Sequence, residues 1–294
     1  MATTPLVNGR QTSAGTTTPR IDWLPILWFG VLLIGCYAPI LYRMGHQWAT
    51  DEDMGHGFFV PLVAGYVAWQ RRDELLATPV ETNWWGLVVV VFAGFLSLIA
   101  TLGVELFTAR LSFVIALAGT VLFLCGTRWV KLLAFPLSLL LFMIPIPAII
   151  YSSLTLRLQM FASQFAEMLI SAVGIPVLRE GNTLKLPSQT LDIVDACSGI
   201  RSLLSLLFLS LVYAYFTDKK VWMRWALLFA TIPIAILANG IRVGVTGMLS
   251  EIDTKLASGI YHETEGYILF IIALAALIVT HRLINVVARR WGKA

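Results

Sequence analysis

The sequence predicts an all-α integral membrane protein: a bundle of about eight spanning helices, with an amphipathic helix and a small β-hairpin on its outer side. Of the 294 residues, 58% are hydrophobic and only 13% are charged, and the mean hydropathy is +0.80. A soluble domain carries about 25% charged residues, so much of this surface must face lipid. Apolar runs of about 20 residues recur, which is the length that a helix needs to cross a bilayer.

The chain begins with a polar segment. Residues 1–20 are rich in threonine, and we expect them to form a disordered cytoplasmic tail ahead of a single membrane domain at 21–294. The first apolar run after the tail lacks a small-residue cleavage site, which argues against a removable signal peptide.

Eight spans are expected, and the second is the weakest. Their approximate ranges are 23–42, 57–70, 84–102, 110–126, 130–147, 199–217, 221–249 and 265–287. The second is short and contains Gly57, Pro61 and Gly65, so it is either tilted or re-entrant. Cys36 and Cys125 lie in apolar runs without a CxxC partner, and we interpret both as small buried hydrophobic residues.

The distribution of charge predicts the orientation. With the N-terminus in the cytoplasm, the inner segments hold most of the cations, which are Arg10, Arg20, Arg71, Arg72, Arg128, Lys131, Lys219, Lys220, Arg224, Arg282, Arg289, Arg290 and Lys293. The outer segments hold fewer, and most of the acids lie outside. The positive-inside rule therefore predicts cytoplasmic termini. The basic pI of about 9.0 reflects this orientation, and no basic stripe with interleaved aromatic residues indicates nucleic-acid binding.

The longest stretch between spans is 148–198. Apolar residues repeat at spacings of three and four from Leu154 to Ala172, which predicts an amphipathic helix at the outer interface, ended by Gly174 and Pro176. Residues 182–194 alternate around a Pro-Ser-Gln turn and predict a β-hairpin that leads to Cys197. Such a hairpin either caps the bundle or offers an edge to an extended peptide.

Cys197 stands where the sixth span begins, on its outer side. The backbone N–H groups of Ser198, Gly199 and Ile200 have no partner inside the helix, so they favour a thiolate and would bind an oxyanion. Gly199 would allow a close approach to the backbone, and Asp195 supplies a polar flank. An inert buried cysteine is the alternative.

Two arginines lie in spans. Arg242 is predicted at the outer boundary of the seventh span, with Asn239 on the same face. A guanidinium in a span marks function by default, although it would also reach lipid headgroups by snorkelling. Arg201, one turn after Cys197, is the rival, and it would otherwise pair with Asp195 or with a lipid phosphate.

Histidines complete the set of candidates. His262 precedes the eighth span on the outer side and suits proton transfer, with Glu263 or Glu265 available to orient it. His56 follows three acidic residues, but that spacing matches no strong metal-binding pattern, and we expect no metal and no cofactor. His281, beside Arg282 at the inner face, is interpreted as structural.

Three strings of residues carry a family resemblance. They are Asp195-Ala196-Cys197-Ser198-Gly199, Asn239-Gly240-Ile241-Arg242 and His262-Glu263-Thr264-Glu265-Gly266. In this order they resemble the signature motifs of the exosortase/archaeosortase family, and His56-Gly57 with Pro61 resembles that family's N-terminal element. The similarity covers about 45–280 and is closest to the stand-alone bacterial exosortases.

The resemblance implies a function in protein sorting. It implies a membrane cysteine transpeptidase of the bacterial inner membrane that cleaves membrane-anchored proteins near a C-terminal Pro-Glu-Pro signal. The acceptor, a lipid or a glycan, stays open, as does release by hydrolysis. By the same resemblance, Cys197 is the nucleophile, Arg242 the electrostatic partner and His262 the acid and base, all on the periplasmic side.

Two other classes of protein fit parts of the pattern. A transporter would line a pathway with Arg242 and His262, but no repeat relates the two halves of the chain. A structural assembly factor for envelope or exopolysaccharide export would use the hairpin for docking and would tolerate loss of the thiol.

Overall fold

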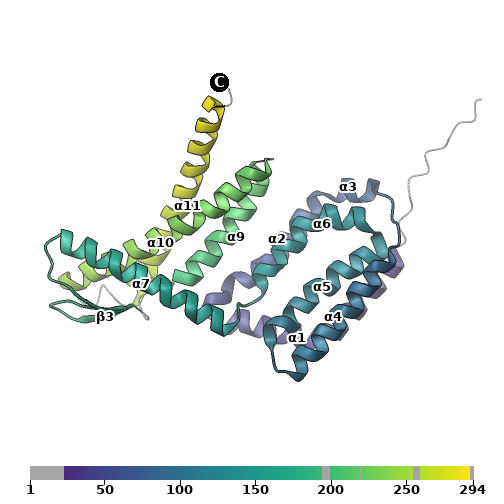
Figure 1. The fold of residues 1–294 in the computed structure, drawn as a ribbon, viewed down its shortest axis with the longest axis horizontal. Coiled ribbons are helices and arrows are strands. Elements are labelled where there is room, and N and C mark those ends of the chain that lie inside the picture. The colour runs from purple at the N-terminus through teal and green to yellow at the C-terminus, as the bar shows by residue number, and fades with distance from the viewer. Residues whose placement is uncertain (1–22, 194–198, 219, 254–258, 292–294) are drawn as a thin grey trace, which may run out of the picture.

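The computed structural model describes the backbone of residues 23–193, 199–218, 220–253 and 259–291, and their side chains apart from positions 52, 259–263 and 291. Helices make up nearly all of this structure, and one small antiparallel sheet is the exception (Figure 1). The predicted helical membrane fold with a small hairpin is confirmed. The predicted tail at 1–20 lies outside the described residues.

Helical elements follow one another through the first half of the chain. They are α1 (Trp23–Thr50), η1 (Glu52–Phe58), α2 (Phe59–Gln70), α3 (Arg72–Ala77), α4 (Trp84–Leu102), α5 (Leu106–Cys125), α6 (Thr127–Leu139) and η2 (Leu140–Met143). The second half contains α7 (Ala148–Ala172), β1 (Leu178–Glu180), β2 (Thr183–Lys185), β3 (Thr190–Asp192), α9 (Gly199–Thr217), α10 (Val221–Ile252) and α11 (Gly259–Trp291).

Two of the predicted spans take a different form. Within the described residues, six helices are long and apolar enough to cross a membrane, or seven if a bent pair counts as one span. The predicted span at 57–70 is η1 followed by the 12-residue α2. The predicted span at 130–147 is α6 and η2, which meet α7 at an angle of 81°. Pro145 and Pro147 lie at this bend, where their missing N–H groups prevent a continuous helix.

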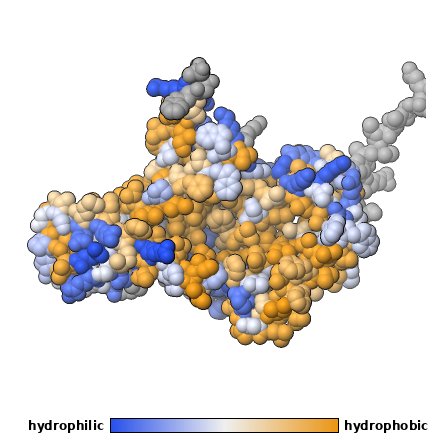
Figure 2. All heavy atoms as spheres, in the orientation of Figure 1, coloured by the Kyte–Doolittle hydropathy of each residue, from blue (hydrophilic) through white to orange (hydrophobic). Residues whose placement is uncertain are grey.

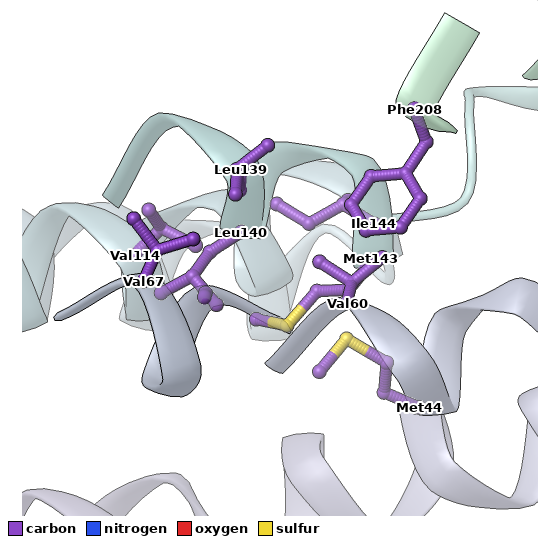
Figure 3. Close-up of a cluster of buried hydrophobic side chains, with 10 residues drawn as sticks. Met44, Val60, Val67, Val114, Leu139, Leu140, Met143, Ile144 and Phe208 are labelled. Carbon is purple, nitrogen blue, oxygen red and sulfur yellow. The ribbon is translucent and has the colours of Figure 1, made fainter. Parts of the chain in front are cut away.

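A hydrophobic core joins the two halves of the chain. Met44 of α1, Val60 of α2 and Leu139 of α6 are almost fully buried in one cluster, which Figure 3 shows. Phe208 of α9 packs into the same cluster beside Met143 and Ile144. This contact fixes the middle of α9 against the α6–η2 corner.

Helix α7 packs closely against α10. Gly240, Gly244 and Gly247 of α10 face α7, and a Cβ atom at Gly240 would lie 2.8 Å from Cδ1 of Phe165. Small residues at such spacing let two helices in a membrane approach each other. The predicted helix is confirmed as α7, but its large apolar side chains do not all face the protein, and its place at the outer interface stays a prediction. Phe161 and Met168 are 58% and 60% exposed.

The small sheet has three strands in the order β1-β2-β3. The predicted hairpin is confirmed as β2 and β3, with Leu184 opposite Leu191, and β1 is a third strand that the pattern did not predict. The hairpin turn is fixed to the end of α10, because the backbone N–H and the hydroxyl of Ser188 both donate to Glu251 Oε1, at 3.0 and 2.6 Å.

The two ends of the bundle differ in composition. At one end, here called the basic end, lie α3, the α5–α6 and α9–α10 junctions and the C-terminal end of α11. Exposed tryptophans mark its rim, namely Trp23, Trp69, Trp84, Trp85, Trp222 and Trp225. Tryptophan is enriched at both interfaces of membrane proteins, and cations are enriched at the cytoplasmic one. Figure 2 shows hydrophilic groups around α3 and over the sheet, with hydrophobic residues covering most of the surface between them.

The two cysteines of the N-terminal half differ in their surroundings. Cys125 is buried, as predicted, whereas Cys36 is exposed on α1. The interpretation of Cys36 as a buried residue is wrong, because hydropathy alone does not distinguish the face of a spanning helix that meets lipid from the face that meets protein.

Candidate active site

A small pocket lies between α9, α10 and α11. Most of its wall is apolar, and its polar side chains are Ser202 of α9 with Asn239 and Arg242 of α10. The remaining lining residues are Leu206, Ala235, Ala238, Gly266, Leu269, Phe270 and Ala273. A guanidinium and an amide thus meet a hydrophobic wall, and ligand sites commonly combine a few polar groups with an apolar lining in this way.

Arg242 reaches this pocket because of the packing of α10. The side of α10 that carries Gly240 lies against Phe165 of α7, and Asn239 and Arg242 line the pocket. Arg242 is only 9% exposed and Asn239 only 7%. The predicted pairing of these two residues on one face is confirmed.

Gly266 of α11 forms the wall against the guanidinium. A Cβ atom at this position would lie 3.1 Å from both Cζ and Nη2 of Arg242. Only a glycine leaves the guanidinium its present place without a shift. The last residue of the third motif therefore contacts the last residue of the second.

Glu265, the neighbour of Gly266, is directed to α10. Its Oε2 atom accepts a hydrogen bond of 2.8 Å from the hydroxyl of Thr246, which is one turn after Arg242. The charge of Arg242 acts on the same carboxylate. The sequence suggested Glu265 as a partner of His262, whose side chain lies outside the described ones, and the described hydrogen bond of Glu265 is with Thr246.

A second polar cluster, here called the Arg201 cluster, joins Arg201, Asp53 and Tyr151. Arg201 Nε donates to Asp53 Oδ1 at 3.0 Å, and the Tyr151 hydroxyl donates to Asp53 Oδ2. These residues come from the first turn of α9, from η1 and from the first turn of α7. Arg201 therefore forms an ion pair with Asp53, while the predicted pairing with Asp195 involves a residue outside the described ones.

His56 lies in η1 close to this cluster. Its Nδ1 atom is buried without a hydrogen bond among the described residues. Burial lowers the pKa of His56, while backbone hydrogen bonds of Phe142 and Asp53 and the charge of Asp53 act in the opposite direction. The next residue, Gly57, packs against the indole of Trp48. In the described part of the chain, no three His, Cys, Asp or Glu side chains are arranged to hold a metal ion.

His281 belongs to a separate network at the basic end. It is 5% exposed, and its ring nitrogens lie 3.0 Å from the Tyr213 hydroxyl and 2.8 Å from Asn285 Nδ2. These contacts join α9 to α11 far from the pocket, which agrees with the predicted structural role.

The structure places only some of the predicted site residues. It brings Asn239 and Arg242 together and holds Arg201 and His56 in the neighbouring cluster. Asp195, Cys197 and Ser198 lie outside the described residues, and Gly199 is the first residue of α9. Position 262 is in the first turns of α11, but its side chain lies outside the described ones.

Sequence reasoning did not assign roles to three residues of the pocket region. Ser202 and Gly266 line the pocket, and Thr246 binds Glu265. The signal for Thr246 was its position four residues after Arg242, on the same helix face. The signal for Gly266 was its place in the third motif.

Comparison with known proteins gives one family. A family model described as transmembrane exosortase matches residues 48–279, which is most of the chain. No curated protein and no solved structure gives a match. The matched range begins just before the Arg201 cluster's Asp53 and ends beyond the pocket.

Proposed function

This chain belongs to the transmembrane exosortase family and is therefore a multi-pass membrane sorting protease, and we propose that Cys197 is its nucleophile. In this proposal, the enzyme cleaves membrane-anchored proteins near a C-terminal Pro-Glu-Pro type signal. It then transfers them to an acceptor through a thioacyl intermediate. A transporter or an assembly factor would not account for the family membership.

One observation supports the proposal: residues of the second and third motifs line one pocket together with Ser202, which follows the first motif on α9. Arg242 and Asn239 come from the second motif and Gly266 from the third. Ser202 lies in the first turn of α9, and Cys197 is only two positions before this helix begins. Position 262 is one helical turn before Gly266, on the stripe of α11 that lines the pocket.

The chemistry follows from the residue types at this pocket. The Cys197 thiolate attacks the scissile carbonyl carbon and forms a C–S bond, while the carbonyl electrons move to oxygen. Arg242 and the backbone N–H groups at the start of α9 stabilise this oxyanion. As the C–N bond breaks, His262 gives a proton to the leaving amine. His262 then takes a proton from the acceptor nucleophile, whose attack breaks the C–S bond.

The other arginine supports the assignment of roles. Arg201 forms an ion pair with Asp53, and its side chain is 39% exposed. Arg242 is only 9% exposed and lines the mostly apolar pocket. A developing oxyanion gains most from a donor that is held in a site shielded from water.

The proposed side of the reaction is the periplasm. Cations and exposed tryptophans mark the basic end of the bundle, and the sheet and the start of α9 lie toward the opposite end (Figure 1). The positive-inside rule assigns the basic end to the cytoplasm. The pocket would then open near the outer leaflet, where a substrate's sorting signal emerges.

The test is to trap the intermediate. Purified full-length protein is incubated with a membrane-anchored sorting-signal peptide, quenched in acid and analysed by peptide mass spectrometry. We expect an acyl group on Cys197, released by hydroxylamine, and none on Cys36 or Cys125. Cys197→Ala should accumulate normally and leave full-length substrate in cells. Continued processing by this variant would remove Cys197 from the mechanism.

A further inference from the structure

Glu265 is a carboxylate in an unusual place. It lies at the start of the apolar part of α11, and its Oε1 atom is buried without a hydrogen bond among the described residues. Its other oxygen accepts from Thr246, whose side chain is fully buried. An ionisable group inside a membrane span is costly and is kept mainly where it has a partner or a function.

The same pair of helices holds the guanidinium of Arg242. Thr246 is one turn after Arg242 on α10, and Gly266, next to Glu265, lies against Cζ of Arg242. The charge of Arg242 also acts on the Glu265 carboxylate. Two contacts between α10 and α11 therefore lie at this part of the helices: Gly266 against the guanidinium and, one turn along α10 from Arg242, the Thr246–Glu265 hydrogen bond.

We propose that Glu265 is a positioning residue that orients the guanidinium of Arg242, and that Thr246 fixes the carboxylate for this task. The inference rests on the proposed function, because it assigns a supporting residue to the proposed oxyanion site. A carboxylate on one side of a guanidinium limits its rotamers and directs its remaining donors into the pocket. Preorganised donors of this kind stabilise developing charge without reorganisation.

A merely structural role would give a different result. If Glu265 and Thr246 only joined two helices, their loss would lower stability and leave the chemistry of the folded fraction unchanged. If they orient Arg242, their loss lowers kcat and leaves KM nearly constant, because the interaction acts in the transition state. The effect must also depend on the presence of a correctly shaped guanidinium at position 242.

The first experiment measures processing of the anchored peptide by purified variants. Thr246→Val removes the donor but keeps the shape, and Thr246→Ser keeps the donor. Thr231→Val is the matched control, since Thr231 is equally buried on α10 and donates only to its own helix, at Leu227 O. We expect Glu265→Gln and Thr246→Val to lower kcat by about tenfold or more. Thr246→Ser and Thr231→Val should stay within about twofold of the parent.

A double-mutant cycle then isolates the connection to Arg242. In an Arg242→Lys background, Glu265→Gln should change the residual kcat by less than about twofold, because the group that it orients is already altered. An effect of Glu265→Gln that is equally large with lysine at position 242 would overturn the inference.

A second readout does not depend on activity. Phenylglyoxal modifies accessible guanidinium groups, and peptide mapping reports each arginine separately. We expect Glu265→Gln and Thr246→Val to raise modification of Arg242 several-fold and to leave Arg201 unchanged. Equal modification of Arg242 in the parent and the variants would show that Glu265 does not position Arg242, even if the enzyme is active. A parent protein that never processes the peptide would instead refute the proposed function, and the modification data would still decide the role of Glu265.

Discussion

The Arg201 cluster and the Arg242 pocket both place an arginine near the start of α9, but the two guanidinium groups differ in their exposure and in the residues around them. Arg201 shares Asp53 with Tyr151, and its side chain is 39% exposed. Arg242 is 9% exposed and lies against the backbone of Gly266 in an apolar pocket. The first arrangement joins chain segments through an ion pair, and the second holds a guanidinium where, in the proposed mechanism, the oxyanion would form. An arginine in a span is therefore best interpreted from its surroundings.

The largest effect is expected for Arg242→Lys. Lysine keeps the charge but loses the planar fork of donors, so the geometry of oxyanion binding is lost. We expect kcat to fall by about 100-fold or more, in the range found for loss of an oxyanion donor. Arg201→Lys should lower kcat much less. Peptide-processing kinetics on both variants measure this, and near-normal processing by Arg242→Lys would transfer the role to Arg201.

The next largest effect is expected for Gly266→Ala. A methyl group 3.1 Å from Cζ must displace the guanidinium or move α11 away from α10. The required shift is a few tenths of an ångström, and since a misplacement of about 1 Å costs up to about 100-fold, we expect kcat to fall by about threefold or more. The matched control is Gly94→Ala on α4, where no atom lies within 4 Å of the new methyl group. Equal kinetics for the two variants would show that Gly266 does not set the position of Arg242.

A smaller effect, mainly on stability, is expected for Asp53→Asn. The change removes the ion pair with Arg201 and weakens the acceptor for Tyr151. Partly exposed ion pairs contribute about 1 kcal/mol or less, so a fall in Tm of about 2–4 °C is expected. Arg201→Gln should give a similar fall, and the double variant should lose no more than either alone. Additive losses would mean that the two residues do not act as a pair. Thermal unfolding in detergent gives the values.

The smallest effect is expected for His56→Gln, on the way thermal stability depends on pH. Burial lowers its pKa from 6.5, so the unfolded chain binds a proton more readily than the folded chain does. The contribution of neutral His56 to the free energy of unfolding is therefore fully present above about pH 6.5, and it decreases as the pH falls below that value. His56→Gln should remove part of this decrease, about 1–3 °C in Tm between pH 7.5 and pH 5.5. The same pH dependence in parent and variant would assign it to other groups.

Much of the fold was readable from hydropathy and flanking residues. The ranges 84–102 and 199–217 match α4 and α9 because polar or glycine residues bound each apolar run. The hairpin was readable from alternation around Pro187. The broken form of the segments 57–70 and 130–147 could not be predicted, because an apolar run indicates the length of a helix but not the elements against which it packs.

Contacts in the candidate site could be predicted from the sequence only where the two residues lie on the same helix. Asn239 and Arg242 share a face of α10, so spacing alone predicted their meeting. The pair of Asp53 and Arg201 joins residues 148 positions apart, and the contact of Gly266 with Arg242 depends on how α11 crosses α10. Such contacts arise from tertiary packing, which no local pattern encodes. The orientation of the protein in the membrane stays a prediction.

The most direct measurement of the central claim is a cross-link between the first and third motifs. In a Cys36→Ser, Cys125→Ser protein, His262→Cys is oxidised in membranes, and disulfide formation with Cys197 is followed by mass spectrometry. Val279→Cys, on an exposed face of α11 toward the basic end, is the control. The account predicts rapid linkage of Cys197 to position 262 and none to position 279. Failure to link at position 262, with both thiols still reactive toward a small maleimide, would contradict a shared site.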